Sequence, residues 1–320
     1  MKEHNVVLGI DTSNYTTSAA IYDLDTHKVT GQRKLLPVPD GQCGLRQSDA
    51  VFHHTQQLHK VISSLFFDVG YKPIIKAVGV SSRPIDKDGS YMPCFSVGVN
   101  TANIIGSVLS VPVYNFSHQQ GHIAAAIYSS GTQYLYNRKF IAFHVSGGTT
   151  EAVIVTPDKD KIFCTQLAAR SLDLHAGQAV DRVGVALGLS FPCGRELEKL
   201  ALSCTQIVKV KTCLKGSDCC LSGIENICRN ILDKGESKEL VALTCLKFLS
   251  KTIEQMCSAV LEQYGQMPIL FAGGVMSNSI IREDLSKKFD CIFAQPEYSS
   301  DNACGTSVLA SLLYNKEVHL

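Results

Sequence analysis

The residues best suited to chemistry are two histidines four positions apart and a distant aspartate. They lie in His118-Gln119-Gln120-Gly121-His122 and in Ser300-Asp301-Asn302. Side chains four positions apart share one face of a helix, so both imidazoles can reach one divalent cation. Asp301 would supply a third ligand and leave coordination positions open for a substrate. Histidines at this spacing also occur where a helix packs a buried face, so the metal-site hypothesis for His118, His122 and Asp301 depends on the rest of the chain.

Glycine-rich turns indicate a second kind of site, for an anion or a nucleotide. In Ser146-Gly147-Gly148-Thr149, two glycines let the backbone come close to a ligand, and N–H groups with a hydroxyl can bind phosphate. Asp11-Thr12-Ser13 stands at the equivalent turn of the first half, which favours phosphate binding over a plain hairpin turn. A third motif, 272–278, follows an apolar strand and begins a helix, where backbone donors face a ligand. Its Asn278 is suited either to an adenine or ribose edge or to capping the helix.

These motifs need elements that position them, and the chain repeats one pattern twice. Segments 9–23 and 144–156 align, and each predicts a strand, a tight turn and a returning strand. The repetition predicts an α/β protein with two lobes, 1–135 and 136–320, separated by a cleft. This layout resembles the duplicated actin-like ATPase (ASKHA) fold, which implies a nucleotide between the lobes. The remaining predicted elements are strands at 29–36, 75–80, 111–114, 161–167, 269–272 and 291–294, and helices at 50–67 and near 96, 118, 176, 196, 240, 278 and 301.

Composition bounds the class of protein. A chain of 320 residues with 45% hydrophobic content can bury two cores and should be a soluble globular protein. The net charge of +1 offers no global attraction for nucleic acid, so any such contact must be local. The absence of a signal sequence or a run of about 20 apolar residues predicts a cytoplasmic protein without membrane contact. The candidate basic contacts for nucleic acid, which are equally well explained as solvated surface, are Arg33, Lys34, Arg46, Arg195, Lys199, Lys209, Lys211 and Lys215.

Cysteines and a group of histidines suggest further metal sites that we do not favour. The chain has 13 cysteines but no Cys-x-x-Cys pair, so we expect reduced, mostly buried thiols. His53, His54 and His59 lie on the amphipathic run 51–65, where surface or packing roles are favoured.

Ordered motifs along nearly the whole chain resemble those of the threonylcarbamoyl transferases that modify tRNA. This family is known in bacteria as TsaD and was formerly named O-sialoglycoprotein endopeptidase. The matching segments are 7–13, 117–122, 145–148, 176–183, 187–194, 221–223, 273–278 and 300–302.

The resemblance implies a reaction and a set of site residues. The reaction is transfer of a threonylcarbamoyl group from threonylcarbamoyl-AMP to the exocyclic amine of an adenosine beside the anticodon. His118, His122 and Asp301 would bind one divalent metal, iron or zinc. The implied partners are tRNA, a smaller actin-like paralogue and an ATPase. The residues implied to line the site for ATP, ADP or the adenylate are Val145, Ser146, Gly147, Gly148, Thr149, Asp181, Gly194 and Asn278.

The chain departs from the family pattern at several polar positions. The Cys-Asp-Glu run of the first turn is Asn14-Tyr15-Thr16, and the acid of the Gly-Glu-Ala fingerprint is Gln178. The histidine that follows Val-Ser-Gly-Gly is Thr149, and the lysine after Leu-Ser-Gly is missing from Ile224-Glu225. These losses suggest a diverged bacterial paralogue.

Three functions follow, and a fourth is disfavoured. The first is the tRNA transferase, the second a carbamoyltransferase with another acceptor, and the third a noncatalytic nucleotide-binding partner of a tRNA-modifying complex. The former peptidase name would require a general base at Gln119, and an amide cannot abstract a proton.

Overall fold

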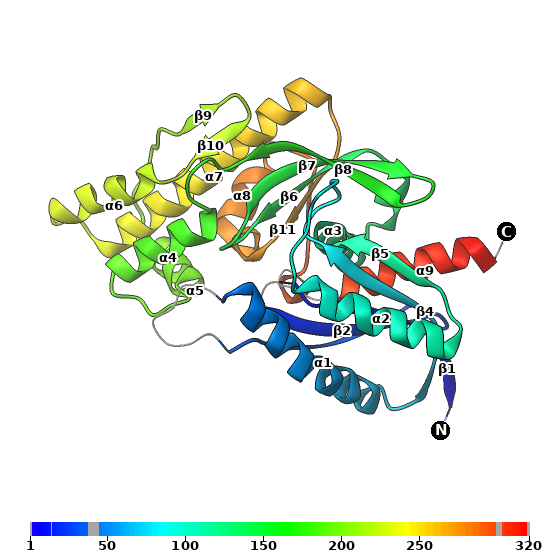
Figure 1. Ribbon diagram of the computed structural model, residues 1–320. Helices are drawn as coiled ribbons and strands as arrows, with labels where there is room; N and C mark the ends of the chain where they lie inside the picture. Colours follow the sequence, from blue (N-terminus) through cyan, green and yellow to red (C-terminus); the bar gives the residue numbers. More distant parts are fainter. Residues whose placement is uncertain (1, 14, 38–44, 299–302, 319–320) are drawn as a thin grey trace. The chain divides into compact units, whose positions relative to one another are not determined.

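The structure is a computed structural model that describes residues 2–13, 15–37, 45–298 and 303–318 (Figure 1). Contacts between Cα atoms divide the chain into two compact units. The first comprises 1–136, 157–164 and 297–320, and the second comprises 137–156 and 165–296.

A five-stranded mixed sheet forms the centre of the first unit. Its strand order is β3-β2-β1-β4-β5. The first three strands are antiparallel, whereas β4 and β5 continue the sheet in parallel with β1. The strands are β1 (Glu3–Asp11), β2 (Thr16–Asp23), β3 (Val29–Leu35), β4 (Lys72–Arg83) and β5 (Val113–Ser117).

Helices cover both faces of this sheet. Alternate residues of a strand face opposite sides, so one side of β1 packs Leu8 and Ile10 in a core that includes Leu58 of α1 and Ala102 of α2. Helix α9 covers the other side, where a Cβ on Gly9 would lie 2.6 Å from the carbonyl oxygen of Ala303. Because α9 packs on β1 and β4, the C-terminal segment groups with the first unit rather than with residues 136–296. The helices are α1 (Gln47–Asp68), α2 (Phe95–Leu109), α3 (His118–Ser130) and α9 (Cys304–Val318), with a 3-10 turn at Gln133–Asn137.

The second unit has a sheet of the same topology, in the order β12-β11-β6-β7-β8. Its core is built around α7, whose buried face includes Val241, Leu249 and Met256. The strands are β6 (Phe140–Val145), β7 (Thr150–Asp158), β8 (Ile162–Arg170), β11 (Ile269–Ala272) and β12 (Cys291–Phe293), with a separate hairpin of β9 (Cys213–Lys215) and β10 (Asp218–Cys220). The helices are α4 (Ala176–Ala186), α5 (Gly194–Leu202), α6 (Gly223–Asp233), α7 (Lys238–Tyr264) and α8 (Ser279–Ser286), with 3-10 turns at Gly274–Ser277 and Pro296–Tyr298.

The two sheets show that the predicted duplication is correct. In each, the first strand stands at the centre and pairs antiparallel with the second strand, and two parallel strands extend the sheet on its other side. The predicted strand triplets overlap β1–β3 and β6–β8. The hairpin β9–β10 and helix α6 were not predicted.

The cysteines behave as the sequence suggested. Every described cysteine is a free thiol, and only Cys213 is exposed. Burial raises the pKa of Cys219 to about 11, so this thiol stays neutral and packs as a small apolar side chain. None of the described helices combines the length and apolar character needed to cross a membrane.

Candidate metal and nucleotide sites

The two histidines of the first motif stand on the first turns of α3. Ser117 caps this helix: its hydroxyl accepts from the backbone N–H of Gln120 at 3.1 Å, while the Gln120 side chain accepts from the Ser117 N–H at 2.8 Å. This capping box fixes where the helix begins and therefore which way His118 and His122 point. Their Nε2 atoms lie 2.9 Å apart.

A buried carboxylate lies behind His118. Asp11, at the end of β1, is 1% exposed, and its Oδ2 lies 2.8 Å from His118 Nδ1 and 2.6 Å from the Ser81 hydroxyl. Its Oδ1 accepts from the Ser13 N–H at 2.8 Å. Burial by itself raises the pKa of Asp11, but the charge and hydrogen bond of His118, together with the bonds from Ser13 and Ser81, lower it overall.

This geometry fits a divalent cation between the two imidazoles. Two ligands at right angles, each about 2.1 Å from an ion, are about 3.0 Å apart, which matches the observed separation of the Nε2 atoms. The hydroxyl of Ser13, two residues from Asp11, is buried without a hydrogen-bond partner among the described residues, as expected where a ligand supplies one. Asp301, the third predicted ligand, lies outside the described residues.

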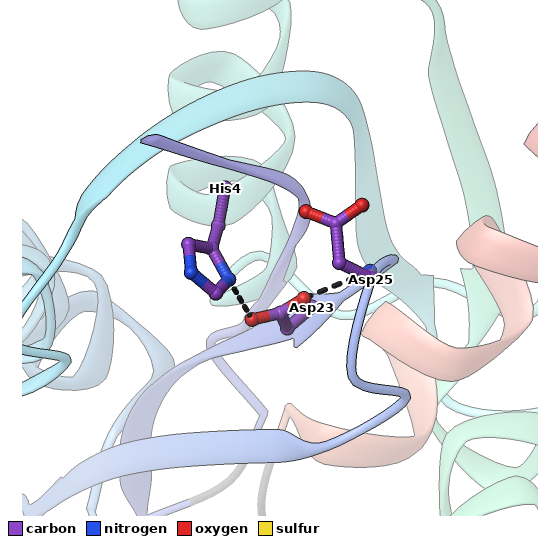
Figure 2. A group of neighbouring side chains, drawn as sticks. All are labelled: His4, Asp23 and Asp25. Atoms are coloured by element: carbon purple, nitrogen blue, oxygen red, sulfur yellow. Dashed lines mark hydrogen bonds and ion pairs between the residues drawn. The ribbon is translucent and has the colours of Figure 1, made fainter. Parts of the chain in front are cut away.

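A second group of ligand-type side chains occurs in the first unit, at His4, Asp23 and Asp25 (Figure 2). Hydrogen bonds account for it. Asp23 Oδ2 lies 2.7 Å from His4 Nδ1, and its Oδ1 accepts from the N–H groups of Asp25 and Thr26 at 2.8 and 3.0 Å. The carboxylate therefore fixes the turn after β2, and we assign the group no metal.

The turn at Asp23 should make stability depend on acid pH. Burial raises the pKa of Asp23, but the hydrogen bonds from Thr26, His4 and Asp25 lower it overall. A carboxylate whose pKa is lowered by folding stabilises the native state above about pH 4, and that contribution is lost as pH falls through the lowered pKa. We expect the gap in urea midpoint between wild type and Asp23→Asn to shrink between pH 6 and pH 3. The control Asp25→Asn removes an exposed neighbour and should show a smaller, flatter gap. A gap for Asp23→Asn that stays constant with pH would contradict this role.

The second unit holds a cavity of about 400 Å³ that joins several of the predicted nucleotide residues. Helices α4 and α5 begin at this cavity, and the loop before α8 completes it. The exposed N–H groups and dipoles of helix N-termini favour an anionic ligand. Its lining comprises Ser146, Gly147, Gly177, Val180, Asp181, Pro192, Gly194, Arg195, Glu198, Leu246, Gly274, Val275, Ser277, Asn278 and Pro296.

The turn after β6 is held by its own side chain. The Ser146 hydroxyl accepts from the N–H groups of Gly148 and Thr149 at 3.3 and 3.2 Å, and the Ser146 carbonyl accepts from Gly177 at 3.0 Å. A Cβ on Gly147 would meet open space, so a ligand can approach this backbone directly. The side chain of Val145 points into the core, and Val145, Gly148 and Thr149 are not among the residues that line the cavity.

Asp181 connects the cavity to the start of α5. Its Oδ1 accepts from the Cys193 N–H at 2.9 Å and so holds the segment that carries Gly194. Its second oxygen remains available for a ligand hydroxyl, which is a suitable task for a carboxylate.

Asn278 combines both roles that the sequence left open. Its side-chain oxygen accepts from the N–H groups of Ile280 and Ile281 at 3.1 and 3.2 Å, so it caps α8. The residue also lines the cavity, where its amide NH₂ can donate to a ligand.

Two charged residues that line the cavity, Arg195 and Glu198, were not predicted for this site. Arg195 follows Gly194 and is exposed; the sequence suggested it only as a nucleic-acid contact. Glu198, one turn further along α5, accepts from both the backbone N–H and the hydroxyl of Ser279, and so ties α5 to α8. The only sequence signal for Glu198 is its position four residues after Gly194, which puts both residues on the same face of a helix.

Two other residues suggested as nucleic-acid contacts lie away from this cavity. Lys209 and Lys211 line a separate hollow beside α6, with Ile227 and Ile231.

His54 on α1 has a packing role, as expected for the histidines of this helix. It is buried, and its Nδ1 lies 2.8 Å from the Thr17 hydroxyl.

Comparison with known proteins identifies the family. The sequence pattern of TsaD, described as tRNA N6-adenosine threonylcarbamoyltransferase, matches residues 41–307. The chain belongs to the TsaD family. The match includes both histidines of α3, Asp301 and every predicted nucleotide residue.

Archaeal relatives match nearly the whole chain. A probable bifunctional tRNA threonylcarbamoyladenosine biosynthesis protein of Thermoplasma volcanium is 24% identical over 98% of this chain. A tRNA N6-adenosine threonylcarbamoyltransferase of Archaeoglobus fulgidus is 23% identical over 97% of this chain and 91% of its own length. The chain spans 58% of the length of the T. volcanium relative and 57% of one from Thermoplasma acidophilum.

Solved structures share the fold of this TsaD-family chain at low identity. An activator of 2-hydroxyisocaproyl-CoA dehydratase from Clostridium difficile with bound ADPNP has a TM-score of 0.53 and 12% identity, and covers 98% of this chain and 97% of its own. A ROK hexokinase from Thermus thermophilus has a TM-score of 0.52 and 12% identity over 97% of this chain and 99% of its own. The predicted actin-like ATPase fold is thereby confirmed.

Proposed function

We propose that this protein transfers a threonylcarbamoyl group from threonylcarbamoyl-AMP to an adenosine of tRNA beside the anticodon. The observation that carries the proposal is the gathering of Ser146, Gly147, Asp181, Gly194 and Asn278 around one cavity. These residues come from four separate segments of the second unit. The nucleotide site was predicted because these residues stand in motifs that resemble those of the TsaD family.

The cavity residues suit the AMP portion of the donor. Helix N-termini and the Ser146-Gly147 turn favour its phosphate, and Asp181 can accept hydrogen bonds from ribose hydroxyls. The amide NH₂ of Asn278 can donate to a ring nitrogen or to an oxygen of the nucleotide.

His118, His122 and the proposed ligand Asp301 would hold one divalent metal, with iron and zinc both compatible with two imidazoles and a carboxylate. A cation there would polarise the carbamoyl carbonyl and stabilise the charge that develops on it. Asp301 precedes α9 by only three positions, and the first turn of α9 packs against Gly121 of α3.

The transfer needs no protein nucleophile. The amine nitrogen forms a bond to the carbamoyl carbon, the bond from that carbon to the phosphate oxygen breaks, AMP leaves with the electron pair, and the amine releases one proton. The protein therefore has to bind, orient and polarise rather than form a covalent intermediate.

We infer that tRNA, a smaller actin-like paralogue and an ATPase are partners. Because the net charge is only +1, the tRNA contact must rest on local cations such as the exposed Lys209 and Lys211 or on the partners.

The direct test is transfer of labelled threonine from threonylcarbamoyl-AMP to unmodified tRNA by the metal-loaded protein, with and without those partners. Label in tRNA is the expected result. Tight adenylate binding without label in tRNA under any partner combination would exclude the tRNA and favour another carbamoyl acceptor.

Removing the carboxylate of Asp181 should weaken nucleotide binding. A hydrogen bond to a charged group contributes about 1.5–3 kcal/mol, so Asp181→Asn should lower the affinity for AMP by about 10-fold or more. The substituted amide keeps an oxygen that can accept from Cys193, so the fold should persist. Glu196→Gln, which changes an exposed carboxylate on the neighbouring helix α5 that does not line the cavity, is the matched control for calorimetric titration. Equal AMP affinity in both variants would remove Asp181 from the site.

A further inference from the structure

The first unit contains a buried chain of hydrogen bonds that ends on His118. Thr306 of α9 lies 3.3 Å from the Ser81 hydroxyl, Ser81 donates to Asp11 at 2.6 Å, and Asp11 contacts His118 Nδ1 at 2.8 Å. Thr306 and Ser81 are fully buried, and Asp11 is 1% exposed. A chain of contacts through three secondary-structure elements, α9, β4 and β1, therefore ends on one ring nitrogen.

The chemistry of this contact assigns the proton. An ionised carboxylate accepts hydrogen bonds and cannot donate them. The Ser81 hydroxyl donates to one oxygen of Asp11 and the Ser13 N–H donates to the other, so both oxygens of the carboxylate act as acceptors. His118 must then carry its proton on Nδ1, which leaves the lone pair of Nε2 directed toward His122 Nε2, 2.9 Å away.

We propose that Asp11 is a positioning residue: it holds His118 in the Nδ1-protonated tautomer and fixes its ring so that Nε2 is ready to bind the metal. The proposal rests on the metal site proposed above and explains how that site is prepared before an ion arrives. If the His118 ring could rotate or carry its proton on Nε2, each binding of a metal ion would cost the free energy of reorienting the ring or moving that proton. Carboxylates behind metal-binding histidines typically change metal affinity by about 10- to 100-fold when removed.

The same arrangement gives α9 a link to the metal site. Thr306, on the first turn of α9, contacts the Ser81 hydroxyl. The orientation of His118 is therefore tied to α9 through Ser81 and Asp11.

The test uses Asp11→Asn, which keeps the shape of the side chain but loses the carboxylate. Its amide NH₂ can donate to Nδ1 and would favour the other tautomer. We expect the affinity for Zn²⁺, measured by competition with a chromophoric chelator, to fall by about 10- to 100-fold while the unfolding midpoint changes little. Asp11→Glu restores the charge and should recover part of the affinity. Asp23→Asn is the matched control, because it removes another buried carboxylate bound to a histidine and should leave Zn²⁺ affinity unchanged.

A second measurement decides the proposal even if Asp11→Asn fails to fold. Long-range ¹H–¹⁵N spectra of metal-free wild type report which nitrogen of each neutral histidine carries the proton, and His118→Ala assigns the signals. Protonation at Nδ1 of His118 supports the proposal, and protonation at Nε2 overturns it. Zn²⁺ affinity of Asp11→Asn within twofold of wild type would also overturn it. Failure of wild type to bind Zn²⁺ or Fe²⁺ would instead sink the proposed metal site, while the tautomer measurement would still report on Asp11.

Discussion

His122→Ala should abolish tight metal binding and reduce threonylcarbamoyl transfer to background. The Nε2 atoms of His118 and His122 are 2.9 Å apart, so removing one imidazole leaves the ion a single nitrogen ligand from α3. A lost direct ligand should cost at least the 100-fold in affinity that marks the upper range for residues behind the ligands. Inductively coupled plasma analysis of the purified protein, with chelator competition, measures the loss.

The fold should survive this change, which makes the result interpretable. Alanine is a better helix former than histidine, and the capping box of Ser117 and Gln120 is untouched. His59→Ala, at an exposed position on α1, is the matched control and should keep both metal and transfer activity. Full transfer activity in His122→Ala with no bound metal would show that the reaction proceeds without the ion.

The fold could be predicted from sequence because its signals are local. Apolar strands joined by small-residue turns mark β1–β2 and β6–β7, and the repetition of that pattern predicts both sheets. The hairpin β9–β10 has strands of only three residues with mixed polarity, too short for a periodic pattern. Helix α6 directly follows that hairpin.

The sequence predicted part of the candidate site. The rest depends on contacts between residues that lie far apart in the chain. Residues in family motifs, such as Asp181 and Asn278, do meet at one cavity. The role of Asp11 could not be read from its turn motif, because the partner that matters, His118, lies 107 positions away. Sequence reasoning placed Asp11 in a phosphate-binding turn, whereas its carboxylate faces a histidine and two hydroxyl-bearing neighbours in the core of the first unit.

Gly305→Ala, which adds only a Cβ, should be among the most destabilising glycine-to-alanine substitutions in this protein. A Cβ at Gly305 would collide with the backbone of α3, at the Gly121 carbonyl and the Ala125 N–H. Replacing glycine by alanine within a helix normally stabilises it by up to about 1 kcal/mol. Here the collision involves backbone atoms that cannot rotate away, and overpacking of this kind costs about 3 kcal/mol. The cost of overpacking exceeds the helix-propensity gain by about 2 kcal/mol, so we expect a fall in Tm of about 4–8 °C, measured by calorimetry.

The same change should also weaken the proposed metal site, because Gly121 lies between His118 and His122. Pushing α3 away from α9 shifts both imidazoles relative to the contact between Ser81 and Thr306. Gly223→Ala is the matched control: it stands at the first residue of α6, where an added Cβ meets nothing within 4 Å, so its Tm should be unchanged or slightly raised. If Gly305→Ala kept wild-type Tm and Zn²⁺ affinity, α3 and α9 would not be as closely packed as the structure has them, and the route from α9 to His118 would lose its physical basis.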